Sequence, residues 1–356
     1  MIRESFRWRS RLHGDVAPRR LPLNPITRRQ WIVTAAGLPL LSAETKKAET
    51  SAFDLSLLYE PNVPNELFFV REHFPAPATT EHQWDISVQA PNVSPSTIRL
   101  EDLLKAPKVV LPAMLECAEN PVGGGLVSQA AWEGVSLSSV LPKTADSKIQ
   151  FVRLSGADGF ERYVPIAKAG NRDTLLAFRM NGQVLPPSHG GPVRALVPGW
   201  YGTDSVKWLR KIELVESAPP DEYRRSNRSL LTGDVSGDRI TSIQVKSVFS
   251  RPQNGAVLRG RRFILRGAAW AGEELVRAVE ISVDDGRSWL PASFAKPQQY
   301  SWLLWEREWK IPGPGEYRLT VRATDEHGNA QPMVRPSSRV DSFEQNACQQ
   351  ISVTVA

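Results

Sequence analysis

The stretch Met180–Ile212 reads MNGQVLPPSHGGPVRALVPGWYGTDSVKWLRKI and decides how we interpret the fold. It places His189 between a proline pair and a glycine pair, and Arg194 and Lys207 follow it along the chain. Glycine-rich turns expose backbone N–H groups, which together with imidazole and cationic side chains provide what a bound phosphate requires. The stretch therefore predicts an anion site. The alternative is a set of ordinary surface charges.

A second informative stretch, Met114–Val127, reads MLECAENPVGGGLV and centres on Cys117. The apolar run Val109–Leu115 predicts a strand that leads into this cysteine. The proline and glycines that follow let the backbone wrap closely around a ligand. A thiolate here would be a soft ligand for a transition metal. The alternative is a small buried thiol without a ligand.

A third stretch, Asn65–Pro77, reads NELFFVREHFPAP. Its apolar part, Leu67–Val70, predicts a short buried strand that delivers Arg71, Glu72 and His73 to a turn marked by prolines. Cationic and imidazole groups at the mouth of a loop can hold an anion. A salt-bridged surface turn is the alternative.

The positive charge of the chain is concentrated at its N-terminus. The 356 residues carry a net charge of +6, and residues 1–31 contain eight arginines against two acidic residues, which is the whole excess. The rest of the chain is neutral overall, so the charge predicts no nucleic-acid partner.

The same N-terminal region resembles a twin-arginine export signal. Arg28 and Arg29 precede a weakly apolar segment, Ile32–Leu41, and then the small residues Ser42 and Ala43. We therefore expect an export signal over residues 1–43 and a periplasmic location. The apolar segment is too short to span a bilayer, and no membrane-spanning helix is predicted. The alternative is a disordered basic arm.

The chain contains two cysteines, Cys117 and Cys348, so no disulfide framework is expected. A bridge between them is allowed by the count alone. We interpret Cys348 as structural or incidental.

The distribution of apolar runs and turns predicts two domains. Residues 44–218 mix strands with short helices, such as Ile98–Lys105 and one beginning at Leu137–Leu141. Residues 219–240 are polar and form a linker, and residues 241–356 alternate as six or seven short strands, which predicts an immunoglobulin-like β-sandwich. The predicted fold class is α+β, with a mixed α/β domain followed by the sandwich.

Several motifs in this order resemble the sulfite oxidase family of molybdenum enzymes. They are Arg-x-His-x-Pro from Arg71, Glu-Cys-Ala-x-Asn from Glu116, the Met180–Ile212 block, and Ala-Thr-Asp-Glu-His-Gly-Asn from Ala323. The resemblance covers roughly residues 55–356. It implies a cofactor-binding domain and a C-terminal dimerisation domain.

The resemblance also implies one molybdenum–molybdopterin cofactor per chain. Cys117 matches the metal ligand and catalytic cysteine, and Arg71 matches a residue that faces the substrate. The residues matching the family's cofactor-binding positions are Val70, Arg71, Glu72, His73, Cys117, Ser155, His189, Arg194, Ser205, Val206 and Lys207. Ser155 falls where relatives often have an aspartate.

The chain departs from the family at positions that bind the substrate. Glu119 replaces a glycine, Val122 replaces an arginine, and Leu303 falls where a second arginine is usual. By spacing, the tyrosine near the metal falls at about Arg228, which we include as a catalytic candidate. Because sulfite is a small dianion, these losses predict a less charged sulfur or nitrogen substrate.

We therefore expect an oxidoreductase that transfers an oxygen atom to or from a small sulfur compound or oxyanion. The chain lacks a Cys-x-x-Cys-His motif. No haem is expected, and a separate c-type cytochrome is the expected electron partner. The C-terminal domain predicts a homodimer or heteromer. Alternatives are a non-catalytic subunit of a redox complex, and a ligand-binding sandwich joined to an unrelated N-terminal domain.

Overall fold

The structure is a computed structural model that describes residues 48–78, 84–143, 146–220, 223, 227–228 and 235–356. At 227–228 and 235–236 it describes the backbone only. The predicted export signal, residues 1–43, lies outside the described residues. Among the described residues, no helix is both long enough and apolar enough to cross a membrane.

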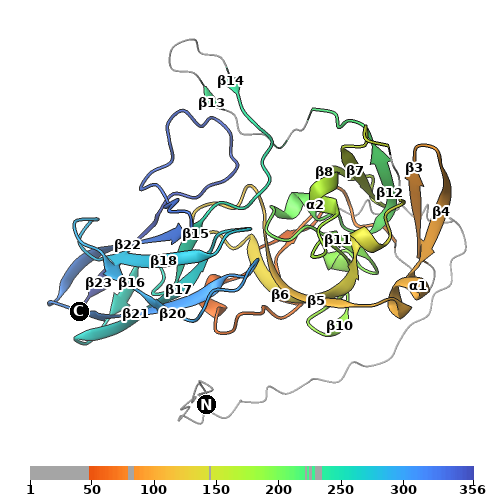
Figure 1. The fold of residues 1–356 in the computed structure, drawn as a ribbon. Coiled ribbons are helices and arrows are strands. Elements are labelled where there is room, and N and C mark those ends of the chain that lie inside the picture. Colours follow the sequence, from red (N-terminus) through yellow and green to blue (C-terminus); the bar gives the residue numbers. More distant parts are fainter. Residues whose placement is uncertain (1–47, 79–83, 144–145, 221–222, 224–226, 229–234) are drawn as a thin grey trace, which may run out of the picture. The chain divides into compact units, whose positions relative to one another are not determined.

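One five-stranded sheet forms the first half of the N-terminal fold (Figure 1). Its strands, in spatial order, are β4 (Val93–Arg99), β3 (Asp85–Ala90), β12 (Leu209–Val215), β7 (Phe151–Gly156) and β8 (Glu161–Pro165). β3 and β12 run parallel, and the other neighbours run antiparallel. Ser155 lies near the end of β7 in this sheet. β12 begins at Leu209, two residues after Lys207.

One strand of the second five-stranded sheet ends directly before Cys117. Its strands are β10 (Gln183–Val184), β9 (Leu175–Met180), β6 (Val127–Ser136) and β5 (Val109–Glu116), with β11 (Arg194–Leu196) also paired to β9. β5 pairs with β6 along its whole length, from Val109 opposite Gly134 to Glu116 opposite Val127. Cys117 therefore follows a fixed strand, as the sequence predicted.

Helices are short in the described residues. The α-helices are α1 (Leu100–Lys105) and α2 (Ile166–Ala169), and the 3-10 helices are η1 (Leu55–Leu57), η2 (Leu137–Ser139), η3 (Pro187–His189) and η4 (Gly202–Asp204). The small sheets are β1 (Thr50–Ser51) with β2 (Val70–Arg71), and β13 (Asn227–Arg228) with β14 (Val235–Ser236). The fold is thus mostly sheet, and the α+β class is only partly supported.

Three local predictions were wrong in detail. The helix expected over Ile98–Lys105 begins at Leu100, because Ile98 and Arg99 end β4. Residues 65–67 form a turn and Phe68 a bend rather than a strand, and the strand β2 holds only Val70 and Arg71. Phe68 and Phe69 are nevertheless buried in the core, which explains why their composition suggested a strand. The helix expected from Leu137 to Leu141 is a single 3-10 turn.

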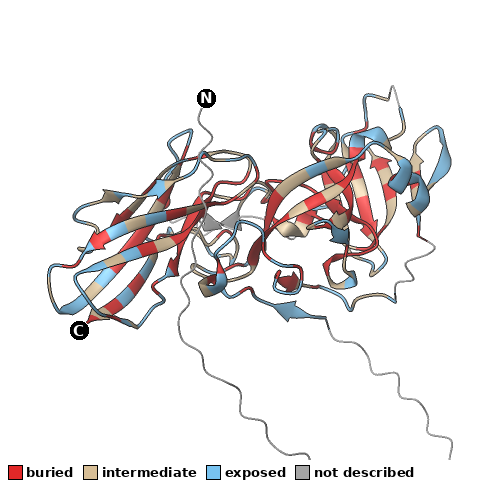
Figure 2. Ribbon diagram, turned by 90° about the horizontal axis from the view of Figure 1, so that it is seen from below, coloured by how far each residue is buried: buried red, intermediate tan, exposed pale blue. Residues whose placement is uncertain are grey.

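The C-terminal part consists of two sheets that share one hydrophobic core (Figure 2). One contains β15 (Lys246–Arg251), β17 (Arg262–Trp270), β21 (Leu303–Lys310) and β20 (Ser293–Phe294). The other contains β16 (Ala256–Leu258), β23 (Gln349–Val355), β22 (Gly315–Asp325), β18 (Val276–Ser282) and β19 (Leu290–Pro291). Side chains from both sheets, including Trp305 and Val321, meet in the core. Buried and exposed residues alternate along strands such as β23, and this alternation allowed the strands to be predicted from the sequence.

Candidate functional site

A pocket opens where the loops around Cys117, His73 and Lys207 meet. It encloses about 770 Å³ of space, part of it open to solvent. It is lined by Phe68, Phe69, Arg71, Glu72, His73, Leu115, Cys117, Ala118, Glu119, Asp158, Phe160, His189, Arg194, Gly202, Thr203, Ser205, Lys207, Trp208 and Tyr223. Cations, carboxylates, aromatic rings and one thiol thus share a single concave site.

Cys117 is a free thiol that lines this pocket. Its backbone is held by Cys117 N donating to Leu126 O at 2.9 Å and by Asn120 N donating to Cys117 O at 2.9 Å. Burial raises the pKa of the thiol, and Glu119 and Glu116 raise it further, while a backbone hydrogen bond at Glu119 and the charge of Arg71 lower it. Without a cation bound beside it, the sulfur therefore stays protonated at neutral pH, and a metal would displace that proton.

Buried positive charge gathers at another part of the pocket wall. The Arg194 guanidinium donates to His189 O at 2.9 Å and to Ser205 O at 2.7 Å. The Lys207 ammonium donates to Ser188 O at 2.7 Å, and its nearest carboxylate oxygen, on Glu72, lies 3.8 Å away. Burial, and then the charge of Arg194, lower the pKa of Lys207 to about 8. Carbonyls satisfy most of these donors without cancelling the charge, so this wall suits an anion.

His189 is neutral at physiological pH and has a defined tautomer. Burial lowers its pKa to about 4. Its Nε2 lies 2.7 Å from the carbonyl oxygen of Asn65, and because a carbonyl only accepts, Nε2 carries the proton. Nδ1 is therefore left as an acceptor.

Gly190 brings the two cationic segments together. Its φ is +99°, in the left-handed region, and a Cβ there would lie 2.9 Å from Lys207 Cβ and 3.1 Å from Arg194 Cβ. Only glycine fits this turn without strain. The glycine pair in the sequence therefore has a structural reason that concerns the site directly.

Near Cys117, Arg71 forms an ion pair with Glu119. The distance from Arg71 Nη2 to Glu119 Oε2 is 3.2 Å, and both side chains are partly exposed. Arg71 also donates to the carbonyl of Glu72 at 3.2 Å. The chain thus sends a cation and its own counterion into the same end of the pocket.

The structure brings most of the predicted site residues together. Arg71, Glu72, His73, Cys117, His189, Arg194, Ser205 and Lys207 all line the pocket. Three predicted residues do not line it: Val70 and Val206 are buried core residues, and Ser155 donates its hydroxyl to Glu161 Oε1 at 2.9 Å. The side chain of Arg228 lies outside the described residues.

Sequence reasoning missed Tyr223, Asp158 and Phe160. Tyr223 is buried at the pocket, and its hydroxyl lies 2.7 Å from His73 Nε2. Phe160 stacks on the His73 ring at 4.8 Å between centroids. Spacing puts the family's tyrosine position at about Arg228, which stays a prediction; Tyr223, five residues earlier in the chain, lines the pocket. The signal was available, because Tyr223 is an aromatic residue in an otherwise polar linker.

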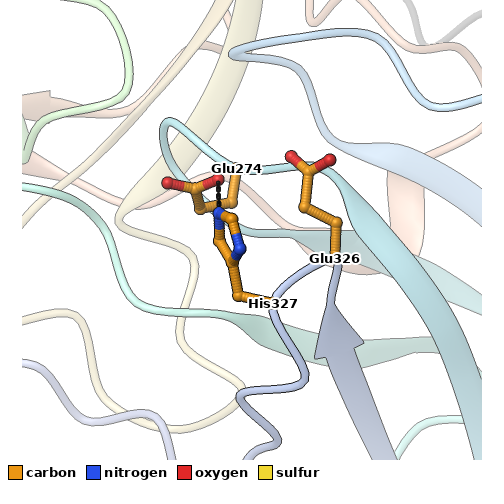
Figure 3. Close-up of side chains that lie close together, drawn as sticks. All are labelled: Glu274, Glu326 and His327. Atoms are coloured by element: carbon orange, nitrogen blue, oxygen red, sulfur yellow. Dashed lines mark ion pairs between the residues drawn. The ribbon is translucent and has the colours of Figure 1, made fainter.

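A second group of potential metal ligands lies apart from the pocket. Figure 3 shows Glu274, Glu326 and His327 close together in the turns before β18 and after β22. His327 Nε2 pairs with Glu274 Oε2 at 2.8 Å, and Glu326 accepts a hydrogen bond from the backbone of Leu275 at 2.9 Å. The group is largely exposed, and these two contacts join the start of β18 to the end of β22.

Two family models match this chain in succession. The oxidoreductase molybdopterin binding domain matches residues 73–223, and the Mo-co oxidoreductase dimerisation domain matches residues 238–356. The chain is also 30% identical to the sulfite oxidase of Gallus gallus over 362 residues, which cover 90% of this chain and 79% of that protein. The chain belongs to the sulfite oxidase family. The resemblance expected from the sequence is thereby confirmed.

Other relatives bear the names of different activities. The chain is 30% identical to mitochondrial sulfite oxidase of Mus musculus, covering 82% of this chain and 61% of that one, and 26% identical to an NADH nitrate reductase of Phaseolus vulgaris, covering 87% and 42%. The crystal structure of the sulfane dehydrogenase SoxCD from Paracoccus pantotrophus superposes with a TM-score of 0.75 at 23% identity, covering 87% of this chain and 86% of that chain. This last comparison shows the shared fold. Family membership alone does not fix the substrate.

The pocket residues fit the family's molybdopterin. The free Cys117 thiol offers a soft sulfur ligand. Arg194 and Lys207 offer buried positive charge whose donors are met mainly by carbonyls, and the left-handed turn at Gly190 leaves room for them to lie together. A pocket with a thiol at one part and an anion wall at another matches a cofactor that carries both a metal and a phosphate.

Proposed function

We propose that this chain is a periplasmic molybdenum–molybdopterin oxidoreductase. It would carry out two-electron oxygen-atom transfer on a small sulfur compound or oxyanion, with sulfite not the preferred substrate. The observation that carries the proposal is that the free Cys117 thiol and the cationic wall of Arg194 and Lys207 open into one pocket. Family membership supports the cofactor and the reaction class.

When bound, the cofactor supplies the oxygen-atom chemistry and the change of two electrons. The chain supplies the surroundings. Cys117 would hold the metal, while Arg194, Lys207 and the neutral His189 would hold the pterin and its phosphate. Asp158, whose pKa is raised by burial, lines the same wall and offers a polar contact to the pterin.

Arg71, Tyr223 and His73 face the remaining space of the pocket. The 2.7 Å contact between the Tyr223 hydroxyl and His73 Nε2 lets this pair share a proton. The stacked Phe160 and the edge of Tyr223 fix the orientation of the imidazole. These residues can therefore orient a polar substrate and supply or accept a proton at the Tyr223 oxygen.

A non-catalytic subunit of a redox complex remains the second candidate, because the family's substrate arginines are missing. Leu303 is buried in the C-terminal core, and neither Leu303 nor Val122 lines the pocket. Redox turnover by the purified chain with an artificial electron acceptor or donor would contradict this candidate.

Export, dimerisation and the electron partner are part of the proposal. The twin-arginine motif supports export to the periplasm, and the match to a dimerisation domain supports association of two copies or with another subunit. A separate c-type cytochrome would accept the electrons, with no haem in this chain. Cell fractionation and the size of the purified protein in solution test the first two points.

The decisive test is the content of molybdenum and pterin in protein purified from a host that makes the cofactor. We expect about one of each per chain, as the family implies. Cys117→Ser should still fold but should disturb the molybdenum ligation, whereas Cys348→Ser changes the other free cysteine, which lies outside the pocket, and should retain the metal. Well-folded protein with neither molybdenum nor pterin, or a fully active Cys117→Ser variant, would overturn the proposal.

A further inference from the structure

The ion pair between Arg71 and Glu119 places opposite charges at the Cys117 end of the pocket. Arg71 comes from the end of β2, and Glu119 comes from the loop that follows Cys117. Their closest nitrogen and oxygen lie 3.2 Å apart, and both residues line the pocket. Glu119 is two residues from Cys117 in the chain, whereas Arg194 and Lys207 donate to the backbone carbonyls of His189 and Ser188 at another part of the wall. The pocket is therefore divided into two electrostatic regions.

The two regions differ in how their cations are paired. Near His189, Arg194 and Lys207 donate to backbone carbonyls, Glu72 lies 3.8 Å from Lys207, and Asp158 lines the same wall. In the region of Cys117, Glu119 offsets Arg71. An incoming dianion there would have to replace Glu119 on Arg71 and would then lie beside the displaced carboxylate. In a partly desolvated pocket this repulsion weakens the binding of the dianion and leaves the binding of an uncharged ligand unaffected. It therefore favours uncharged ligands over dianions.

We propose that Glu119 is a specificity-determining residue that neutralises Arg71 and so directs the pocket to an uncharged substrate. The substrate class is an uncharged sulfur or nitrogen compound, such as a sulfoxide or an amine oxide or its reduced form. The aromatic side chains of Phe69, Phe160 and Tyr223 in the same lining suit the apolar substituents of such compounds. This inference rests on the proposed function, and it names the substrate class.

Sulfate is the probe, because it is a dianion of the size of sulfite and does not titrate near neutral pH. Its affinity is measured by calorimetry on the cofactor-loaded protein, where the phosphate of the cofactor occupies the His189 region. Glu119→Gln removes the charge and keeps the shape of the side chain. We expect sulfate to bind about tenfold more tightly to this variant, the size of effect that one charge-assisted hydrogen bond gives.

Glu308→Gln is the matched control. Glu308 forms an exposed ion pair with Arg262 at 3.0 Å and lies outside the pocket, so this variant makes the same change in net charge. It should bind sulfate as the unchanged protein does. In an Arg71→Gln background the gain from Glu119→Gln should be smaller, because only the repulsion of Glu119 is then removed and no cation is freed.

Turnover gives a second readout. Glu119→Gln should lower the KM for sulfite and leave the KM for an uncharged oxide nearly unchanged. Sulfate affinity that is the same in Glu119→Gln and in the unchanged protein, or a gain that is equally large without Arg71, overturns the inference.

Failure of the proposed function would look different. It would appear as missing molybdenum and pterin, whereas the effect of Glu119 on sulfate binding needs only Arg71 and the folded chain. In protein without cofactor, the Arg71→Gln background identifies which part of the sulfate binding belongs to this end of the pocket. Each inference can therefore be overturned separately.

Discussion

Glu116, the residue before Cys117 in the chain, forms a buried ion pair with Lys246. Lys246 Nζ lies 2.7 Å from Glu116 Oε1, and both residues are at most 3% exposed. Glu116 also accepts from Asn120 Nδ2 at 2.9 Å and from Trp270 Nε1 at 2.8 Å. Lys246 begins β15 and Trp270 ends β17, so the C-terminal sheet holds the residue that precedes Cys117.

Lys246→Met should therefore be strongly destabilising. It leaves the Glu116 carboxylate buried without its cation, which costs about 3–5 kcal/mol. Urea unfolding measures the loss. Arg262→Met is the control, because it breaks the exposed pair with Glu308 and should cost less than about 1 kcal/mol. Equal, small losses in both variants would contradict a structural role for the buried pair.

Tyr223→Phe tests the partner of His73. The variant loses the hydroxyl that lies 2.7 Å from His73 Nε2. We expect turnover to fall about 10²-fold, the scale of a positioned proton donor, and stability to fall by about 1 kcal/mol.

Tyr317→Phe is the matched control, because it also removes one hydrogen bond made by a tyrosine hydroxyl. Its hydroxyl donates to Gly313 O at 2.8 Å in the C-terminal part, outside the pocket. It should lose similar stability and keep its turnover. Unchanged turnover in Tyr223→Phe would remove this tyrosine from the reaction.

The sequence was informative where chemistry depends on local runs. His189, Gly190 and Arg194 lie close together in the chain, and the turns between them need the glycines and prolines that the sequence displays. The position of Cys117 at the end of a strand was predicted for the same reason, because a strand and a glycine-rich loop flank it. Periodicity likewise gave most C-terminal strands.

The sequence was uninformative where contacts join distant irregular segments. The hydrogen bond between His73 and Tyr223 spans 150 positions and involves a linker without periodicity, so the sequence did not indicate it. At β7 the expected position, Ser155, pairs with Glu161, and the turn beyond the strand sends Asp158 into the pocket. The ion pair between Arg71 and Glu119 also depends on tertiary placement. The sequence marked Arg71 as a site candidate and Glu119 as a departure from the family, but not their contact.

Anion binding by the cofactor-free protein should weaken above about pH 8. Burial lowers the pKa of Lys207 from 10.5 to about 8, so its charge is lost as pH rises through about 8. Sulfate affinity should fall about tenfold between about pH 7 and pH 9.5 as one charged donor disappears. Lys207→Met should bind weakly throughout and show no such step.

The same shift fixes the sign of the effect on folding. From about pH 8 to 10.5, the unfolded chain keeps a proton that the folded chain has released, so Lys207 makes the cofactor-free protein more stable as pH rises. Urea unfolding of the unchanged protein and Lys207→Met across this range measures the difference. A flat difference would show that Lys207 titrates normally in the folded protein.

Gly190→Ala should damage both the fold and the anion wall. Gly190 and Gly182 both have positive φ, +99° and +76°, so alanine is strained by about 1 kcal/mol at each. At Gly182 a Cβ would meet nothing within 4 Å, whereas at Gly190 it would lie 2.9 Å from Lys207 Cβ. Relieving that contact must move Lys207 or Arg194.

The two glycine variants therefore separate backbone strain from damage to the site. Gly182→Ala should lose about 1 kcal/mol and keep its pterin, because only the hairpin turn between β9 and β10 is affected. Gly190→Ala should lose about 2–4 kcal/mol, the sum of strain and overpacking, and should retain less pterin. Urea unfolding and the pterin released per chain measure the two effects. If both variants retain pterin equally, Gly190 serves only the backbone, and the left-handed turn does not shape the anion wall.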